Sequence, residues 1–271
     1  MRIDIVDPAD ERVADYRTLR DADLRKRYER SAGVFIAEGP TVVRALLASR
    51  YPTRSLLVDP RRAQELAPLL DGTDVPVYVA QREVLYDIVA FRMHQGALGC
   101  GRRLPARDPA EVISGAHRLL VLEAMNDHEN MGALFRTARA FSVDGVLLGP
   151  RCADPLYRRS VRVSMGHVLH LPHATTVDLP AALASLHAQG ITTVALTPDA
   201  DATPLEEIDT AHRLALLLGA EGPGLPAETL AAADLRARIP MAAGVDSLNV
   251  AAAAAVALYA LRGSRPGYTS V

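Results

Sequence analysis

The organisation of this chain is decided by residues 239–250, Ile-Pro-Met-Ala-Ala-Gly-Val-Asp-Ser-Leu-Asn-Val, and by the five alanines 251–255 that follow them. The stretch predicts a short buried strand, a tight turn at Gly244 and then a helix whose N-cap is Asp246 or Ser247. A strand end beside a helix N-terminus brings backbone N–H groups and a hydroxyl to one place. The alanine run leaves one helix face with almost no side-chain bulk, so the helix can approach another backbone closely. The pattern is typical of a ligand-holding corner in an α/β domain.

Length and composition are those of an ordinary globular protein. The chain has 271 residues, which favours two domains, and 49% of them are hydrophobic and 23% charged. No apolar run is long enough to span a bilayer, and the first four residues do not resemble a signal peptide. The two cysteines, Cys100 and Cys152, form neither a metal-ligand spacing nor a disulfide framework. We therefore expect a cytoplasmic, reduced protein without a metal site.

The net charge of −2 lacks the global basic signature of a nucleic-acid binder. The basic residues are nevertheless unusual, because Lys26 is the only lysine among 30 of them. A GC-rich genome explains this bias most simply. A preference for planar, bidentate phosphate contacts is the alternative, and the sequence does not separate the two.

Two blocks of alternating strand and helix patterns define the predicted domains. Residues 1–101 form the first, a small α/β domain that opens with an arginine-rich helical segment over 13–31; its charged face is either solvated or an RNA contact. The proline-broken residues 102–112 are the predicted linker. In the second domain, 113–271, near-continuous apolar strands are typical of a parallel sheet covered on both faces. Its expected strands are 119–122, 145–148, 191–196 and 214–218, and its expected helices are 130–141, 155–164, 179–189, 226–233 and 247–262.

Three segments of the second domain carry polar groups at the point where a strand ends and a loop begins. In 123–139, Asn130 is placed to cap a helix that carries Arg136 and Arg139, and a plain N-cap is as good an interpretation as a functional one. In 216–226 a buried strand ends at a glycine-rich loop with Glu221. That loop either holds a nucleotide-like ligand or is a structural turn, and it is neither a dinucleotide fingerprint nor a Walker loop. Residues 239–250 are the third segment, and no Ser-His-Asp order or His/Cys metal spacing competes with these three.

In this order, the three segments resemble the three motifs of the SpoU-type RNA ribose methyltransferases of the SPOUT superfamily. The residues that carry the resemblance are Asn130-x-Gly132…Arg136-Thr137-Ala138, then Leu218-Gly219-Ala220-Glu221-Gly222-x-Gly224, then Ile239-Pro240-Met241…Ser247-Leu248-Asn249-Val250. The match covers residues 118–262. Residues 15–101 are similar to the family's common amino-terminal substrate-binding domain, with landmarks at 35–39 and 94–96.

The resemblance implies S-adenosylmethionine as cofactor, methyl transfer to a ribose 2′-hydroxyl of RNA, a trefoil knot in the second domain, and a homodimer whose site takes residues from both subunits. It implies a cofactor site at Thr197, Gly219, Ile239, Met241 and Leu248. Matching catalytic or substrate-orienting positions are Asn130, Arg136, Glu221, Ser247 and Asn249. We expect Lys26, Arg30, Arg139 and Arg158 to contact RNA.

The separate amino-terminal domain favours ribosomal RNA over tRNA as substrate, because it is more typical of family members that act on ribosomal RNA. Alternatives are a tRNA ribose methyltransferase, a catalytically silent RNA-binding protein of the same fold, and a non-RNA α/β enzyme that holds another nucleotide at Gly219. For the mechanism, Arg136 is expected to clamp an RNA phosphate rather than to act as a base, since arginine stays protonated in proteins.

Overall fold

The computed structural model describes residues 1–262 except Thr18, His94, Thr210 and Ala211, and except the side chains of Ala22, Asp23 and Lys26. From its composition we expect the tail 265–271 to be poorly ordered, and this tail and the landmark His94 lie outside the described residues. Contacts divide the chain into two compact units. The first comprises Met1–Pro105 and Asp154–His170, and the second Ala106–Ala153 and Leu171–Val271.

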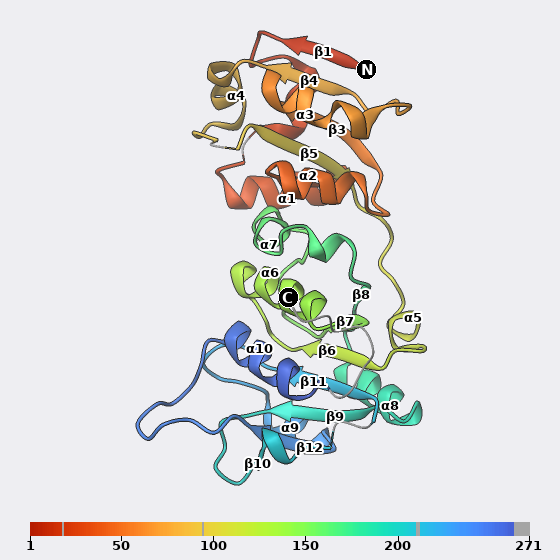
Figure 1. Ribbon diagram of the computed structural model, residues 1–271, viewed down its shortest axis with the longest axis vertical. Coiled ribbons are helices and arrows are strands. Elements are labelled where there is room, and N and C mark those ends of the chain that lie inside the picture. Colours follow the sequence, from red (N-terminus) through yellow and green to blue (C-terminus); the bar gives the residue numbers. More distant parts are fainter. Residues whose placement is uncertain (18, 94, 210–211, 263–271) are drawn as a thin grey trace. The chain divides into compact units, whose positions relative to one another are not determined.

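The first unit is a mixed five-stranded sheet with helices (Figure 1). The strand order is β1-β4-β3-β5-β2; β5 is antiparallel to both of its neighbours, and the other pairs are parallel. The strands are β1 (Arg2–Ile5), β2 (Val34–Glu38), β3 (Thr53–Val58), β4 (Val77–Ala80) and β5 (Ala97–Arg102). The helices are η1 (Glu11–Tyr16), α1 (Ala22–Ala32), α2 (Pro40–Leu47), α3 (Pro60–Leu70), α4 (Arg82–Val89), α7 (Arg158–Val163) and η2 (His167–Leu169).

The structure divides the arginine-rich segment 13–31, which we predicted as one helix. A 3-10 helix, η1, ends at Tyr16, and α1 begins only at Ala22. Two aspartates account for the division, because Asp10 accepts a hydrogen bond from the Arg12 N–H and Asp21 accepts one from the Leu24 N–H. Such side-chain bonds favour the start of a new helix over the continuation of an old one.

The second unit is the predicted parallel α/β layer, with seven strands in the order β10-β12-β9-β11-β6-β7-β8. The strands are β6 (Arg118–Leu122), β7 (Gly145–Leu148), β8 (His173–Thr175), β9 (Thr192–Leu196), β10 (Thr203–Pro204), β11 (Leu214–Leu218) and β12 (Leu235–Arg238). The helices are α5 (Pro109–Ile113), α6 (His128–Ala140), α8 (Leu179–Ala188), η3 (Leu205–Glu207), α9 (Ala227–Ala232) and α10 (Val250–Ala260). The α/β prediction is confirmed; the domain boundaries at 102 and 112 and the trefoil knot stay predictions.

Strand order reverses between β6 and β11. Beyond β6 the sheet continues through β7 and β8, whereas β11 leads to β9 and β12. The carboxyl ends of parallel strands at such a reversal are where open α/β sheets bind ligands. The loops that leave β6 and β11 are two of the three segments singled out in the sequence.

The prediction of a buried strand at the start of 239–250 is wrong. The strand, β12, ends at Arg238, and residues 242–249 are exposed. Two features of the sequence obscured the position of β12. The strand contains two arginines, and it is followed closely by Pro240, which has no N–H to donate to a neighbouring strand. The predicted N-cap at Asp246 or Ser247 is also wrong, because the Asn249 side chain caps α10 by accepting from the N–H groups of Ala251 and Ala252.

A buried threonine ties β9 to the start of β12. Thr193 donates both its N–H and its hydroxyl to Asp234 Oδ2, each at 2.8 Å, and His187 Nε2 lies 3.2 Å from the same oxygen. Burial alone would raise the pKa of Asp234, but the Thr193 hydrogen bonds and the charge interaction with His187 outweigh it and lower that pKa below its ordinary value of 3.8.

Asp234→Asn is therefore expected to destabilise the protein at neutral pH and not in acid. Because the folded-state pKa is depressed, its contribution is present above about pH 4 and is lost as the pH falls through the folded pKa. The Asp234 side chain is 43% exposed, so solvent screening limits the effect to about 1 kcal/mol. Urea unfolding at pH 7 and pH 3 measures this, with the exposed Asp74→Asn as control. An equal deficit at both pH values would contradict the assignment.

Candidate active site

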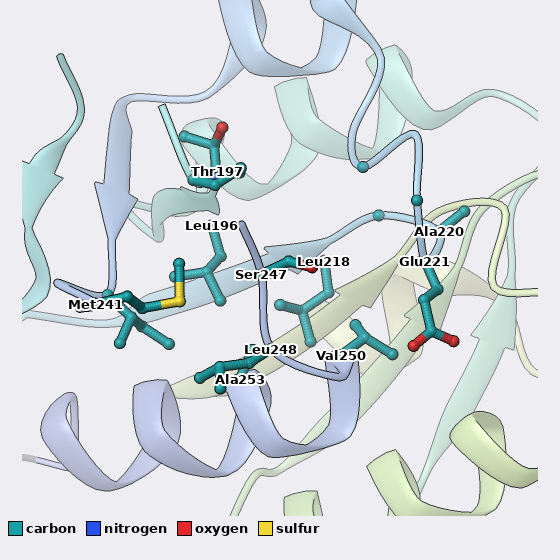
Figure 2. A pocket seen from close by; sticks show the side chains of 15 residues that line it. Leu196, Thr197, Leu218, Ala220, Glu221, Met241, Ser247, Leu248, Val250 and Ala253 are labelled. Carbon is teal, nitrogen blue, oxygen red and sulfur yellow. The ribbon is translucent and has the colours of Figure 1, made fainter. Parts of the chain in front are cut away.

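A cavity of about 140 Å³ opens at the carboxyl ends of β9 and β11 (Figure 2). All five residues that the resemblance assigned to the cofactor line it, together with the predicted catalytic residues Glu221 and Ser247. The complete lining is Leu196, Thr197, Pro198, Leu218, Gly219, Ala220, Glu221, Gly222, Gly224, Ile239, Met241, Ser247, Leu248, Val250 and Ala253. The strand end 196–198, the loop after β11 and the segment before α10 thus meet at one place, although they are far apart in the sequence.

The loop after β11 depends on Gly219. A Cβ built on Gly219 would lie 2.1 Å from the carbonyl carbon of Gly224 and 2.3 Å from the nitrogen of Leu225. The loop doubles back at this point, and the Gly224 N–H donates to the Ala220 carbonyl at 3.0 Å. Only glycine permits such an approach of two backbones. The turn therefore has a structural role and also forms a cavity wall; that it holds a nucleotide-like ligand stays a prediction.

Three predicted catalytic residues form a closed hydrogen-bonded triangle. The Asn130 amide donates to Glu221 Oε2 at 3.0 Å, and the Asn249 amide donates to Asn130 Oδ1 at 3.0 Å and to Glu221 Oε1 at 3.3 Å. Asn249 Oδ1 caps α10, which leaves its NH₂ group to face the other two residues. Glu221 accepts from both amides, one at each carboxyl oxygen, so its side chain is held at both oxygens.

The prediction that Asn130 caps α6 is wrong, and the correction explains the triangle. Asp127 is the N-cap, accepting from the N–H groups of Glu129 and Asn130 at 2.9 and 2.7 Å. Asn130 is inside the first turn, where its side chain is 9% exposed and points to Glu221 and Asn249. An aspartate three residues before Asn130 is a standard N-cap signal that the sequence contained.

Arg136 and Ser247 stand apart from the triangle. Arg136 is exposed on α6 and does not line the cavity, and no hydrogen bond or ion pair to another described residue engages it. Ser247 lines the cavity from an exposed segment of the chain. A single chain therefore places Glu221 and Ser247 in the cavity lining, with Asn130 and Asn249 hydrogen-bonded to Glu221, but leaves Arg136 facing solvent.

The residues expected to contact RNA are dispersed. Arg30 and Arg139 are exposed on α1 and α6, and the side chain of Lys26 lies outside the described residues. Arg158 is instead engaged within the first unit, where it forms an ion pair with Glu38 and donates to the Leu19 carbonyl at 3.1 Å. Glu38 also forms an ion pair with Arg162 at 3.2 Å. Glu38, one of the landmark residues 35–39, therefore has a structural role in the first unit.

The chemistry of the cavity fits S-adenosylmethionine. Leu196, Leu218, Ile239 and Leu248 supply apolar surface for an adenine ring and a methionine chain, and the glycine loop supplies close backbone approach. Glu221 is the one charged side chain among the described lining residues, and its negative sign suits a sulfonium cation. Within the described residues, no group of three or more His, Cys, Asp and Glu side chains could hold a metal ion.

Several proteins with similar sequences and structures are named as RNA methyltransferases. Residues 117–259 match the SpoU rRNA Methylase family. An uncharacterized tRNA/rRNA methyltransferase of Mycobacterium bovis is 46% identical over 259 residues, covering 94% of this chain and 90% of that protein. A 23S rRNA (guanosine(2553)-2′-O)-methyltransferase of Bacillus subtilis is 28% identical over 253 residues, covering 93% and 96%. The crystal structure of an AdoMet-bound rRNA methyltransferase from Sinorhizobium meliloti superposes with a TM-score of 0.82 at 26% identity, covering 96% and 97%.

Proposed function

The chain belongs to the SpoU family of RNA methyltransferases and is an S-adenosylmethionine-dependent RNA 2′-O-methyltransferase, and from this premise we propose that it methylates ribosomal RNA. Two observations support this substrate. The chain matches a 23S rRNA methyltransferase over 93% of its length, and a solved rRNA methyltransferase over 96%. Both matches therefore include the amino-terminal unit as well as the methyltransferase unit.

The observation that carries the proposed site is the Asn130–Glu221–Asn249 triangle at a cavity lined by Gly219 and Leu248. When bound, S-adenosylmethionine supplies an electrophilic methyl group on a sulfonium whose leaving group is a neutral thioether. The protein's task is then to position the ribose and to stabilise the charge that develops on its 2′-oxygen. We assign Ser247 and the triangle to ribose positioning, since Ser247 lines the cavity and the triangle is held by hydrogen bonds beside it.

We assign Arg136 to the phosphate next to the reacting ribose. A guanidinium binds a phosphate through two parallel hydrogen bonds and keeps its positive charge throughout the reaction. It therefore stabilises the negative charge on the 2′-oxygen as the hydroxyl proton leaves to solvent, and it is unsuited to removing that proton itself. Because Arg136 faces solvent in the single chain, a second copy has to supply it if the site combines residues from two subunits.

The substrate is tested by incubating the full chain with labelled S-adenosylmethionine and either ribosomal RNA or total tRNA. We expect ribose methylation in ribosomal RNA only, at one nucleotide found by mapping 2′-O-methyl groups with and without the gene. Methylated tRNA would favour the tRNA alternative. Cofactor binding without a methylated product from either RNA would favour a catalytically silent RNA-binding protein.

A homodimer is the second part of the proposal, and helix α10 supports it. The helix is apolar on all sides, with Ala254, Ala257 and Leu258 buried, while Val256 and Tyr259 are 45% and 56% exposed on its outer side. Helices that are apolar on every side are normally buried. The neighbouring Val245 and Leu248 are also exposed, at 49% and 40%, so the apolar surface extends to the cavity. A second copy of the chain is the partner that we propose for this surface.

Replacing Val256 and Tyr259 together by aspartate is expected to produce monomers that lack methyltransferase activity. The aspartate at position 256 would place a charge in an apolar contact. The aspartate at position 259 would also remove the ring on which Arg262 stacks, with the guanidinium carbon 3.6 Å from the ring centroid. Sedimentation velocity measures the association state, and Leu69→Asp is the matched control, because Leu69 is 45% exposed on α3 of the other unit. A double variant that stays dimeric, or an active monomer, would contradict the proposal.

No helix among the described residues is long and apolar enough to cross a membrane. The cytoplasmic location predicted from the sequence stays a prediction.

A further inference from the structure

Glu123 is a buried carboxylate that the mechanism above does not use. It directly follows β6 and is 7% exposed. Its backbone N–H donates to the carbonyl of Leu218 at 2.9 Å. Its side-chain Oε2 accepts a 2.7 Å hydrogen bond from the hydroxyl of Thr229, which is 3% exposed. One residue thus contacts two segments that lie about a hundred positions further along the chain.

Those two segments are the two ends of the glycine loop, residues 219–226. Leu218 is the last residue of β11 and directly precedes the loop, and Thr229 lies in α9, which directly follows it. The loop contributes Gly219, Ala220, Glu221, Gly222 and Gly224 to the cavity lining (Figure 2). Contacts that fix both ends of the glycine loop therefore also position one wall of the cavity.

Helix α9 needs this external support. It has six residues, and its N-cap, Pro226, offers no side-chain hydrogen bond. So short a helix has little stability of its own, and its position depends on tertiary contacts. Leu230 of α9 and Leu225, which precedes the helix, pack against the core. The Glu123–Thr229 hydrogen bond adds a directional contact between α9 and the residue that follows β6.

We propose that Glu123 is a positioning residue for the cofactor loop and that its hydrogen bond with Thr229 sets the affinity for S-adenosylmethionine. The inference rests on the assignment of this cavity to the cofactor. A buried carboxyl oxygen needs a donor, so loss of the Thr229 hydroxyl leaves Glu123 Oε2 without the hydrogen bond that it accepts beneath the loop. We expect α9 to move or water to enter in compensation, and the end of the loop to shift with α9.

Thr229→Val in the full chain removes the hydroxyl and keeps the shape of the side chain. Isothermal titration calorimetry with S-adenosylmethionine is expected to show an approximately tenfold higher Kd, which corresponds to about 1.4 kcal/mol. Activity is expected to show the same rise in KM for S-adenosylmethionine, with kcat and RNA affinity close to those of the wild type. Thr229→Ser retains the donor and is expected to bind the cofactor as the wild type does.

Thr176→Val is the matched control for a purely structural effect. Thr176 is also buried, at 8% exposure, and its hydroxyl donates to the Asp178 carbonyl at 2.9 Å, but it follows β8, the edge strand that is three places from β11. This variant is expected to lose thermal stability and keep its cofactor Kd. Glu123→Gln, which keeps an acceptor oxygen, provides a second test; we expect its Kd to rise less than that of Thr229→Val.

Two outcomes would overturn the inference. One is a Thr229→Val protein that loses as much stability as Thr176→Val but binds S-adenosylmethionine with wild-type affinity. The other is a Thr229→Ser protein that binds the cofactor as weakly as the valine variant. A wild-type chain that fails to bind S-adenosylmethionine would be a different result, because it would remove the assignment of the cavity and this inference with it.

Discussion

Arg136→Ala is expected to abolish methyl transfer and to leave the affinity for S-adenosylmethionine unchanged. Arg136 is exposed on α6 and does not line the cavity, so its replacement leaves the residues that surround the cofactor unchanged. It removes the guanidinium that we assign to the RNA phosphate. Loss of one fixed donor to developing negative charge slows reactions by about 10²–10³-fold, and we expect a fall in kcat of at least this size.

Arg136→Lys separates an electrostatic clamp from a base. Lysine keeps the charge but loses the planar fork, so a clamp predicts a partial loss of kcat, about tenfold, at neutral pH. Lysine also gives up a proton far more readily than arginine. If residue 136 were the base, the lysine variant would gain activity steeply at alkaline pH. We expect a pH–rate profile with the same shape as that of the wild type.

Arg139→Ala is the matched control on the same helix. It also removes an exposed arginine, three residues further along α6. We expect weaker RNA binding and a smaller dependence of that binding on salt, with kcat retained, because a contact to the RNA backbone adds affinity without chemistry. Near-normal turnover by Arg136→Ala, or equal losses of kcat in both alanine variants, would refute the role assigned to Arg136.

The alternation of apolar strands with helices was sufficient to predict the two α/β layers, because periodic burial is local information. Strand β12 escaped prediction for the opposite reason. Its residues Leu235 and Arg236 are exposed, and it is a strand because β9 and β10 pair with it on its two sides. The residues that pair with β12 lie 34 or more positions away, so the four residues of the strand do not reveal the pairing.

For the site, too, local motifs were enough to identify residues, whereas contacts between residues far apart in the sequence required the fold. The order of the three motifs identified the residues around the cavity, including Gly219 and Leu248. Pattern alone left Asn130 equally open as a helix cap or a functional residue. The fold reveals that Asp127 is the cap and that Asn130 contacts Glu221, 91 positions away. Arg158 is a second example, since the fold reveals an ion pair with Glu38, 120 positions away, that the sequence did not predict; its contact with RNA stays a prediction.

Gly219→Ala is expected to eliminate measurable binding of S-adenosylmethionine. The new Cβ would lie 2.1 Å from the carbonyl carbon of Gly224, 2.2 Å from its oxygen and 2.3 Å from the nitrogen of Leu225. All three are backbone atoms, so no side chain can rotate away and the two segments of the loop have to separate by about 1 Å. A displacement of this size in a positioning element costs about a hundredfold, and we expect the Kd to rise at least that much.

Gly222→Ala tests whether this effect is steric or belongs to any glycine of the loop. A Cβ at Gly222 meets no atom within 4 Å, although its φ of +90° makes alanine unfavourable there by about 1 kcal/mol. We therefore expect Gly222→Ala to lose some thermal stability and to bind the cofactor within about threefold of the wild type, since the strain is local and nothing is displaced. Calorimetric titration, with circular dichroism to establish that each variant is folded, measures both effects. Wild-type affinity in a folded Gly219→Ala protein would mean that the close approach of Gly219 to Gly224 does not shape the cofactor site.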